Sequence, residues 1–395
     1  METDMANMID YLEWRGDLSF CTAGFNEVDN LLLAQLAYVD FDGIVPGQDS
    51  GADISLREAS DIFWSGHDEE EILSRVSMTK WAPIVMRSMA ETERFCNIRL
   101  SRYVNDVSDE EQSQFSVVCA ALADGSIYVA FSGTDDTIVG WRENFNMGYL
   151  AETPGQLKAV QYLDRLDGAS EQKLRVGGHS KGGNLSVYAA VKCLSQIRKR
   201  ILAVYSNDGP GFNHEMTESE AYQRMLPKIK TILPESSIVG MLLEHQENYE
   251  VVKSSQSGIQ QHDALSWEVL GASFVYVEQV AMKSVLLDET MKAWLCQLKP
   301  EERQAIVDTV FSMLEAADIR TVDDFYRSKW KKVQELLKAT NRLPEETQQL
   351  LAKAVKLLWT EGNKAVRRAV KEKREGAYSY KKSIKSHKNG ENIKT

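Results

Sequence analysis

Apolar and polar residues follow two different periods along this chain, helical near both ends and strand-like in the middle. Near the N-terminus, apolar positions at helical spacing predict a helix over 25–39 and a helical region over 54–93. Runs rich in Val, Phe and Tyr follow at 114–121 and 126–132. The Asp124-Gly125 pair between these runs is typical of a β-hairpin. The hairpin predicts an antiparallel edge on the sheet that it enters.

From about residue 156 the pattern becomes a regular succession of helices and strands. The expected helices are 156–166 and 184–197, and the expected strands are 173–177, 201–206, 228–233 and 249–253. A further short strand, 99–103, is expected before the hairpin. Such alternation predicts a mostly parallel sheet with helices on both faces, so the expected fold class is α/β.

After about residue 272 the strand pattern ends and only helical periodicity remains. The expected helices are 274–298, 300–317, 322–340 and 344–373. Pro300 and Pro344 each precede two Glu residues, as is typical of a helix start. We expect an α/β domain over 1–280 that includes the N-terminal helices, a helical region over 281–375, and a basic tail over 376–395. The pattern leaves open whether the helical region is a separate domain or packs on the sheet.

Composition narrows the class of protein. A net charge of -12 argues against general nucleic-acid binding. The five cysteines show no C-x-x-C spacing, which argues against a disulfide framework and a zinc site, and Cys119 and Cys193 lie in apolar stretches where we expect buried thiols. No apolar run is long enough for a membrane span, and the acidic N-terminus does not resemble a secretory signal. We therefore expect a cytoplasmic protein.

The last segment has the opposite charge to the rest of the chain. Residues 364–395 hold eleven Lys and Arg and three Glu. A solvated helix end followed by a disordered tail explains this composition. The alternative is peripheral contact with an anionic lipid surface or an acidic partner.

The strongest chemical motif is Gly178-His179-Ser180-Lys181-Gly182, a G-x-S-x-G pattern between a predicted strand and a predicted helix. In that context the serine lies on a tight turn, and glycines two residues before and after it allow the strand and helix to approach closely. The turn exposes the hydroxyl at the edge of the sheet where α/β proteins bind ligands. Alternatives are a structural serine in a Gly-rich turn and a phosphate-binding loop, although the GxxxxGK[ST] order of the latter is missing.

A serine hydroxyl needs a neighbouring base, usually a histidine held by a carboxylate. In G-x-S-x-G hydrolases the acid and then the histidine follow the serine along the chain. His262 lies in a loop after the last predicted strand and is the expected base. Two other histidines are weaker candidates. His245 is explained equally well as a surface residue, and His214 follows its strand too closely.

The acid has two candidates. Asp208 follows the strand that comes after the serine turn, and its alternative role is an ordinary turn residue before Gly-Pro. Glu235, after the next strand, is its rival. Asp263 adjoins the histidine in sequence and should point away from it.

An oxyanion hole needs two donors. The backbone N–H of Lys181, directly after the serine, is the first, and Thr134, in the loop after strand 126–132, is expected to give the second through its N–H and hydroxyl. A hydroxyl that only stabilises the turn is the alternative role of Thr134.

These residues resemble a known group of enzymes. The stretch Ala130-Phe131-Ser132-Gly133-Thr134-Asp135, with Trp141 and Asn144 downstream and the Gly-His-Ser-x-Gly-Gly turn, is similar to class 3 lipases. Two positions depart from that pattern: Ser132 replaces the usual Arg, and class 3 lipases place their acid near Ser237, which is not acidic here.

The full set of motifs is more similar to a bacterial family of uncharacterised lipase-like α/β-hydrolases, the Mbeg-like proteins. The additional motifs are Asn207-Asp208-Gly209-Pro210-Gly211-Phe212, Ser237-Ile238-Val239-Gly240 and Gln261-His262-Asp263. The resemblance covers about residues 20–280 and implies an α/β-hydrolase fold. It supplies no physiological substrate.

The leading hypothesis is a serine hydrolase that cleaves acyl esters of small molecules or lipids. Ser180 would attack the ester, His262 would move the proton, Asp208 would orient His262, and Thr134 and Lys181 would hold the oxyanion. This chemistry requires neither a metal nor an organic cofactor. The alternative is a catalytically silent scaffold that binds a partner through the C-terminal helices.

Overall fold

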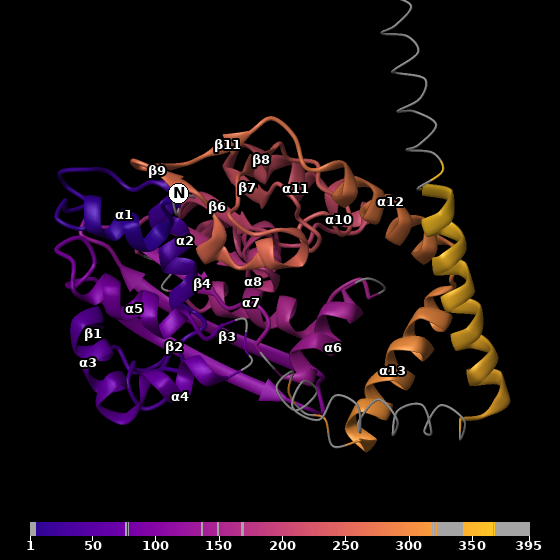
Figure 1. Ribbon diagram of the computed structural model, residues 1–395. Helices are drawn as coiled ribbons and strands as arrows, with labels where there is room; N and C mark the ends of the chain where they lie inside the picture. The colour runs from indigo at the N-terminus through magenta and orange to yellow at the C-terminus, as the bar shows by residue number, and fades with distance from the viewer. Residues whose placement is uncertain are drawn as a thin grey trace, which may run out of the picture.

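The computed structural model describes residues 5–75, 77, 79–135, 137–147, 150–166, 170–317, 319, 321, 343–365 and 367. Its centre is a nine-stranded sheet in the order β1-β2-β3-β4-β5-β6-β7-β8-β11 (Figure 1). The strands of this sheet are β1 (Ile54–Ser55), β2 (Arg99–Ser108), β3 (Ser113–Ala121), β4 (Ile127–Phe131), β5 (Leu174–His179), β6 (Ile201–Asn207), β7 (Ile229–Pro234), β8 (Tyr249–Val252) and β11 (Tyr276–Val277). A separate ribbon pairs β9 (Val269–Leu270) with β10 (Ser273–Phe274).

Helices surround this sheet. They are α1 (Met8–Arg15), α2 (Glu27–Leu36), α3 (Leu56–Gly66), α4 (Glu69–Ser74), α5 (Ala82–Ala90), α6 (Ile138–Asn146), α7 (Pro154–Asp164), α8 (Lys181–Lys192), α9 (Ser195–Arg200), α10 (His214–Thr217), α11 (Glu220–Met225), α12 (Met282–Cys296) and α13 (Pro300–Ala316). Short 3-10 helices are η1 (Leu226–Lys228), η2 (Gly258–His262) and η3 (Ala264–Ser266), and a further helix occupies 345–365.

The sheet separates two hydrophobic cores because successive side chains of a strand point to opposite faces. In β3, Val118 and Ala120 pack into the core that α1, α2, α3 and α5 cover. Val117 and Cys119, on the opposite face, pack with α7 and α8. Burial on both faces explains why the second half of β3, Val117 to Ala121, is continuously apolar rather than alternating.

The strand directions follow the predicted pattern. β3 pairs antiparallel with β4, which confirms the hairpin, and β4 to β8 pair in parallel. An antiparallel edge that leads into parallel strands, with covering helices and a sharp turn from β5 into α8, is the α/β-hydrolase fold.

Two expected stretches differ from the structure. The region 54–93 is not continuous helix, because Ile54 and Ser55 pair with β2 as the edge strand β1 before α3 begins. Strands also continue past residue 272, since Tyr276 pairs with Val252 of β8 and extends the sheet. The helix expected from residue 274 therefore begins only at Met282.

The helices after the sheet pack beside α6 and α12 (Figure 1). Arg142 of α6 lies 2.6 Å from Asp308 of α13, and the rings of Phe145 and Phe311 join the same two helices. Trp294 of α12 donates a hydrogen bond of 2.9 Å to the carbonyl of Ala354 in the helix at 345–365. These contacts connect the C-terminal helices to the sheet-bearing part of the chain.

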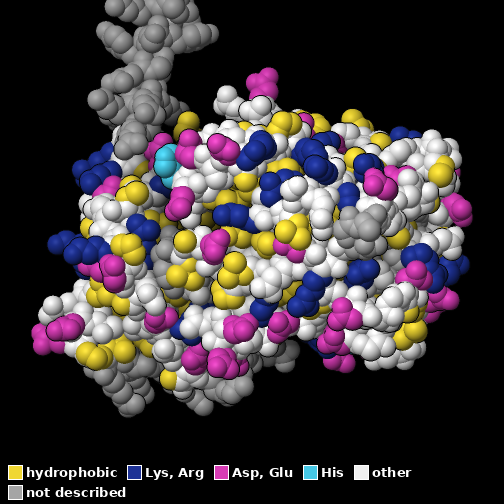
Figure 2. Space-filling view, turned by 180° about the vertical axis from the view of Figure 1, so that it is seen from behind, with side chains coloured by type: hydrophobic (Ala, Val, Ile, Leu, Met, Phe, Trp, Pro, Cys, Tyr) yellow, Lys and Arg dark blue, Asp and Glu magenta, His cyan; other side chains and the backbone are white. Residues whose placement is uncertain are grey.

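The remaining expectations for the C-terminus lie outside the described residues. They concern the helix 322–340, the end of the helix expected at 344–373 and the basic tail at 376–395. Within the described ranges, no helix combines the length and apolarity that crossing a membrane would need. On the face shown in Figure 2, basic and acidic side chains are interspersed.

Candidate active site

Ser180 lies at the turn between β5 and α8, in a strained backbone conformation. Its φ is 57° and its ψ is -131°, values that residues with a side chain rarely adopt. The backbone N–H of Ser180 donates to the carbonyl of Asn207 at the end of β6, and the carbonyl of Ser180 accepts from Gly183. These bonds hold the strained turn against the neighbouring strand.

Two glycines permit this turn. A Cβ added to Gly178 would lie closer than 3.0 Å to the backbone of Gly182, and one added to Gly182 would lie equally close to the carbonyl of Phe131. Strand β4, the turn and the start of α8 therefore approach more tightly than any side chain allows. Larger residues at these positions require the backbone to move.

Asp208 and His262 form a hydrogen-bonded pair. Asp208 directly follows β6 with a positive φ of 49°, and its Oδ2 lies 2.6 Å from Nδ1 of His262. Its other oxygen accepts hydrogen bonds from the Ser237 hydroxyl at 2.5 Å and the Gly240 N–H at 3.1 Å. The Asp208 side chain is fully buried.

The charge of Asp208 is stabilised in this setting. Burial by itself raises the pKa of a carboxyl group, but the hydrogen bond and charge of His262, together with the Ser237 hydroxyl, outweigh it. The pKa of Asp208 consequently lies below its ordinary value. A carboxylate at Oδ2 requires Nδ1 of His262 to carry a proton, which leaves Nε2 of the neutral ring as an acceptor.

A second imidazole positions His262. Nε2 of His179 lies 2.8 Å from the His262 carbonyl, so this nitrogen carries the proton of His179. Nδ1 of His179 then accepts a hydrogen bond from the Tyr38 hydroxyl at 2.9 Å. Burial, followed by the nearby charge of His262, lowers the pKa of His179 to about 3. His179 is therefore neutral. It holds the backbone of His262, and Asp208 orients the ring of the same residue.

No hydrogen bond joins Ser180 to His262 in this conformation. Within the described part of the chain, the Ser180 hydroxyl has no hydrogen-bond partner, and neither has Nε2 of His262. Catalytic hydrogen bonds are often long in ligand-free enzymes and tighten with substrate. The structure thus joins Asp208 to His262 and leaves the contact between His262 and Ser180 open.

The two expected oxyanion donors lie on either side of the turn. Lys181 is the first residue of α8, where backbone N–H groups have no partner within the helix. The Thr134 hydroxyl accepts a hydrogen bond of 2.6 Å from the side-chain amide of Asn144, so its own hydrogen is left for another acceptor. Asn144 belongs to α6, which ties that helix to the loop after β4.

The side chain of Lys181 turns away into the protein. Its Nζ lies 3.0 Å from Glu143 Oε2 and 2.5 Å from two oxygens of Gln114, and both charged side chains are fully buried. Glu143 also accepts from the backbone N–H groups of Gln114 and Gly155. The ion pair joins α6 to the start of α8. Only the backbone of Lys181, not its side chain, is therefore available at the serine turn.

The competing candidates have other partners. Glu235 faces the side-chain amide of Gln261 at 3.5 Å. His245 is not a surface residue, since its side chain is 10% exposed and lies 2.9 Å from Glu247. His214 is on the surface beside Glu244, and Asp263 caps η3.

A cavity of about 220 Å³ opens beside Ser180. Its lining comes from α6, the start of α8, the segments after β6 and β7, and α12. The residues that line it are Trp141, Asn144, Phe145, Met147, Ser180, Lys181, Pro210, Val239, Leu242, Leu243, Met291, Lys292, Trp294 and Leu295. The expected C-terminal helical region therefore contributes directly to the surroundings of the serine.

Several residues around the site were not singled out from the sequence. His179 precedes the serine and was not among the candidate bases, and its bond to the His262 carbonyl joins residues 83 positions apart. Ser237 did carry a signal, because class 3 lipases have their acid nearby and this chain has a hydroxyl there. Tyr38 and Glu143 gave none, since each acts through residues distant in sequence.

Comparisons with known proteins identify one family that matches this chain. The model of the Mbeg1-like family matches residues 89–312, which is more than half of the chain. The crystal structure of M37 lipase is similar over 55% of this chain and 70% of its own, at 16% sequence identity and a TM-score of 0.33. The search of curated proteins finds no match.

Proposed function

The chain belongs to the Mbeg1-like family, and we propose that this member is a serine hydrolase that cleaves acyl esters. The observation that carries the proposal is a strained serine at the end of β5, directly after the His179 that bonds the backbone of His262, together with the bond from the His262 ring to the buried Asp208. Strand–turn–helix serines with such partners are the nucleophiles of α/β-hydrolases.

The first half of the reaction acylates the enzyme. Nε2 of His262 takes the hydroxyl proton of Ser180 as Oγ attacks the ester carbonyl carbon. The tetrahedral oxyanion accepts hydrogen bonds from the Lys181 N–H and from Thr134. Its collapse breaks the bond to the alcohol oxygen, and the alcohol leaves with the proton that His262 held.

The second half releases the acid. His262 takes a proton from water as the water oxygen attacks the acyl carbon on Ser180, and then returns that proton to Oγ. Asp208 stays ionised and stabilises the imidazolium in both halves, in keeping with its lowered pKa. Each proton is accounted for by the chain and water.

A fluorophosphonate probe tests the nucleophile directly, because it labels activated serines covalently. The wild-type protein should be labelled and Ser180→Ala should not. Ser195→Ala, which changes an exposed serine at the start of α9, is the matched control and should label as the wild type does. Equal labelling of wild type and Ser180→Ala would reject the proposal.

A binding function is the second candidate, and one observation favours it. Trp359 and Val355, one turn apart on the helix at 345–365, are 74% and 69% exposed. Large apolar side chains together on a surface commonly mark contact sites. If the full-length wild type shows neither probe labelling nor ester turnover, this alternative is preferred over hydrolysis.

A further inference from the structure

The cavity beside Ser180 has walls of mostly apolar side chains from elements far apart in the sequence. Trp141 and Phe145 come from α6, and Leu242 comes from the segment after β7. Met291 and Leu295 of α12 form the opposite wall. A cavity with this lining favours an apolar group, and the serine at its edge places that group next to the ester carbonyl.

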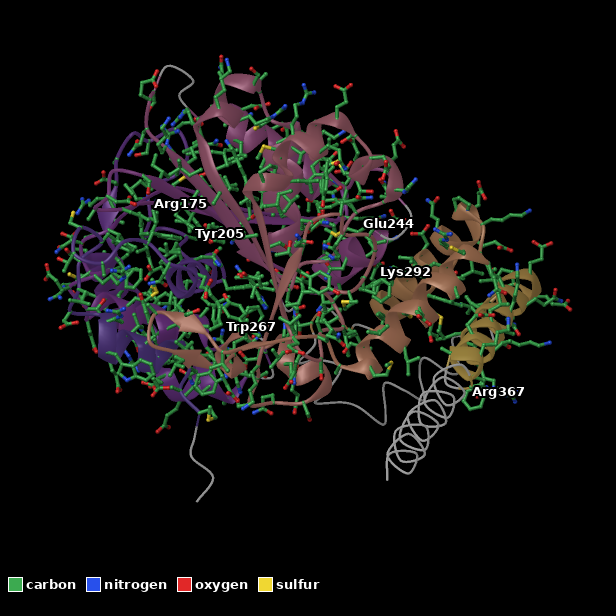
Figure 3. All side chains as sticks on the ribbon, turned by 90° about the horizontal axis from the view of Figure 1, so that it is seen from above. Arg175, Tyr205, Glu244, Trp267, Lys292 and Arg367 are labelled. Carbon is green, nitrogen blue, oxygen red and sulfur yellow. The ribbon has the colours of Figure 1, made fainter. Side chains whose placement is uncertain are left out.

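Among the described lining residues, two lysines carry a charge. The Lys181 ammonium is turned into the protein and paired with Glu143. Lys292 is exposed on α12, where this helix faces the sheet-bearing part of the chain (Figure 3). The lining residues that the structure describes include no carboxylate, so among them a cationic ligand finds no opposite charge, and a neutral chain fits better.

The volume sets the length of the group. A dry cavity of about 150 Å³ holds one benzene molecule, that is six carbons. By the same proportion, the cavity of about 220 Å³ holds an acyl chain of roughly six to nine carbons. The size corresponds to a medium-chain acyl group.

The two helices α6 and α12, which line the cavity, are each bonded to a helix of the C-terminal region. Trp294, which lines the cavity, donates a hydrogen bond to the Ala354 carbonyl and so ties α12 to the helix at 345–365. Arg142 pairs with Asp308, so α13 holds the facing helix α6. The width of the cavity between α6 and α12 therefore depends on helices that follow the sheet in the sequence.

We infer that this cavity binds the acyl chain of a medium-chain ester, and that Leu295 and Met291 of α12 set its maximum length. The inference rests on the proposed hydrolase function, which it extends to a substrate class. It assigns the C-terminal helices a role in specificity, in place of a separate binding domain.

The first test measures kcat/KM for nitrophenyl esters from two to sixteen carbons. The wild type should be best at roughly six to nine carbons. Leu295→Trp fills the cavity and should lower kcat/KM for the eight-carbon ester about tenfold or more, since even one misfitted methylene costs about that much. The two-carbon ester should change less than about twofold. Leu295 is only partly buried, so the fold should tolerate the change.

Met282→Trp is the matched control. It puts the same side chain on the same helix, at a position that is 63% exposed and outside the cavity. Its chain-length profile should equal that of the wild type. An unaltered profile in Leu295→Trp would overturn the inference, as would a wild-type optimum at two or at sixteen carbons.

The second test does not depend on turnover. Binding of 1-octanol is measured by calorimetry in Ser180→Ala and in the Ser180→Ala, Leu295→Trp double variant. Octanol should bind the former and bind the latter at least about tenfold more weakly. Octanol binding without any hydrolysis by the wild type would reject the proposed function alone. If the wild type hydrolyses esters but octanol binds equally well with and without Leu295→Trp, the inferred acyl-binding site alone is rejected.

Discussion

The hydroxyl of Ser237 lies 2.5 Å from Oδ1 of Asp208 and donates a hydrogen bond to it. The two residues come from the ends of neighbouring parallel strands, β6 and β7. Class 3 lipases, which this chain resembles, have their acid near Ser237. In this chain the carboxylate of Asp208 follows the preceding strand, β6. The hydroxyl of Ser237, after β7, donates a hydrogen bond to it.

Removing that hydroxyl should weaken the carboxylate. In Ser237→Ala the Oδ1 atom of Asp208 keeps only the Gly240 N–H, and a hydrogen bond to a charged group contributes about 1.5–3 kcal/mol. We expect the free energy of unfolding, measured in urea, to fall by about that amount, and ester turnover to fall with it. Ser237→Thr should retain both. Ser236→Ala, one residue away, is the control, and an equal loss there would contradict the assignment.

Burial of His179 should make the protein sensitive to acid. The unfolded imidazole titrates near pH 6.5, whereas the pKa in the fold is about 3. Between these values the unfolded chain binds a proton that the folded chain does not, so the free energy of unfolding rises with pH. The stabilisation is complete above about pH 6.5 and is lost as the pH falls, by about 1.4 kcal/mol per unit.

Replacement by glutamine isolates this contribution. His179→Gln keeps a donor for the His262 carbonyl and an acceptor for Tyr38 but does not titrate, so its unfolding free energy should depend less on pH between 4.5 and 6.5. Urea denaturation at several pH values measures the difference in slope. His214→Gln, whose side chain is 75% exposed, should keep the wild-type slope. Identical slopes for all three proteins would show that His179 titrates normally.

The buried pair of Lys181 and Glu143 predicts non-additive effects. Lys181→Met leaves a buried carboxylate without its cation and should destabilise the fold by about 3–5 kcal/mol. The double variant Lys181→Met, Glu143→Gln removes both charges and keeps an acceptor for the Gly155 N–H. It should be more stable than Lys181→Met alone. A double-mutant cycle in urea checks this, and additive losses would mean that the two charges do not interact.

The short distance between β4 and the serine turn predicts which glycines can be replaced by alanine without loss of stability. Gly182→Ala forces a methyl group against the Phe131 carbonyl, so we expect a loss of more than about 3 kcal/mol in unfolding free energy or no soluble protein. Gly24→Ala, whose added methyl group meets nothing within 4 Å, should be nearly neutral. Thermal denaturation compares the two. Equal melting temperatures would contradict the described geometry.

Local patterns were enough to predict several central strands and the serine turn. Apolar runs bounded by turn residues locate β3, β4 and β6 to within a residue or two, because burial on both faces leaves an unbroken apolar run. The order of motifs along the chain led to Asp208 and His262, which lie together in the structure. These features depend on short segments whose residues lie next to each other in sequence.

Other features needed the fold. Lys181 was expected to matter only through its backbone, because nothing nearby in the sequence shows that its side chain is buried against Glu143. The helix predicted for 274–298 begins later in the structure, because Tyr276 pairs with β8 in spite of the helical pattern around it. Each depends on a partner dozens of residues away, and periodicity does not report such partners.

The wall that α12 gives to the cavity has a consequence for biosynthesis. Every strand of the central sheet, along with Ser180, Asp208 and His262, precedes Met282 in the chain. Because domains fold from the N-terminus as they emerge from the ribosome, the sheet with these three residues can assemble before α12 has been translated. Until then the cavity beside Ser180 lacks the side chains of Met291 and Leu295, and translation of α12 supplies them.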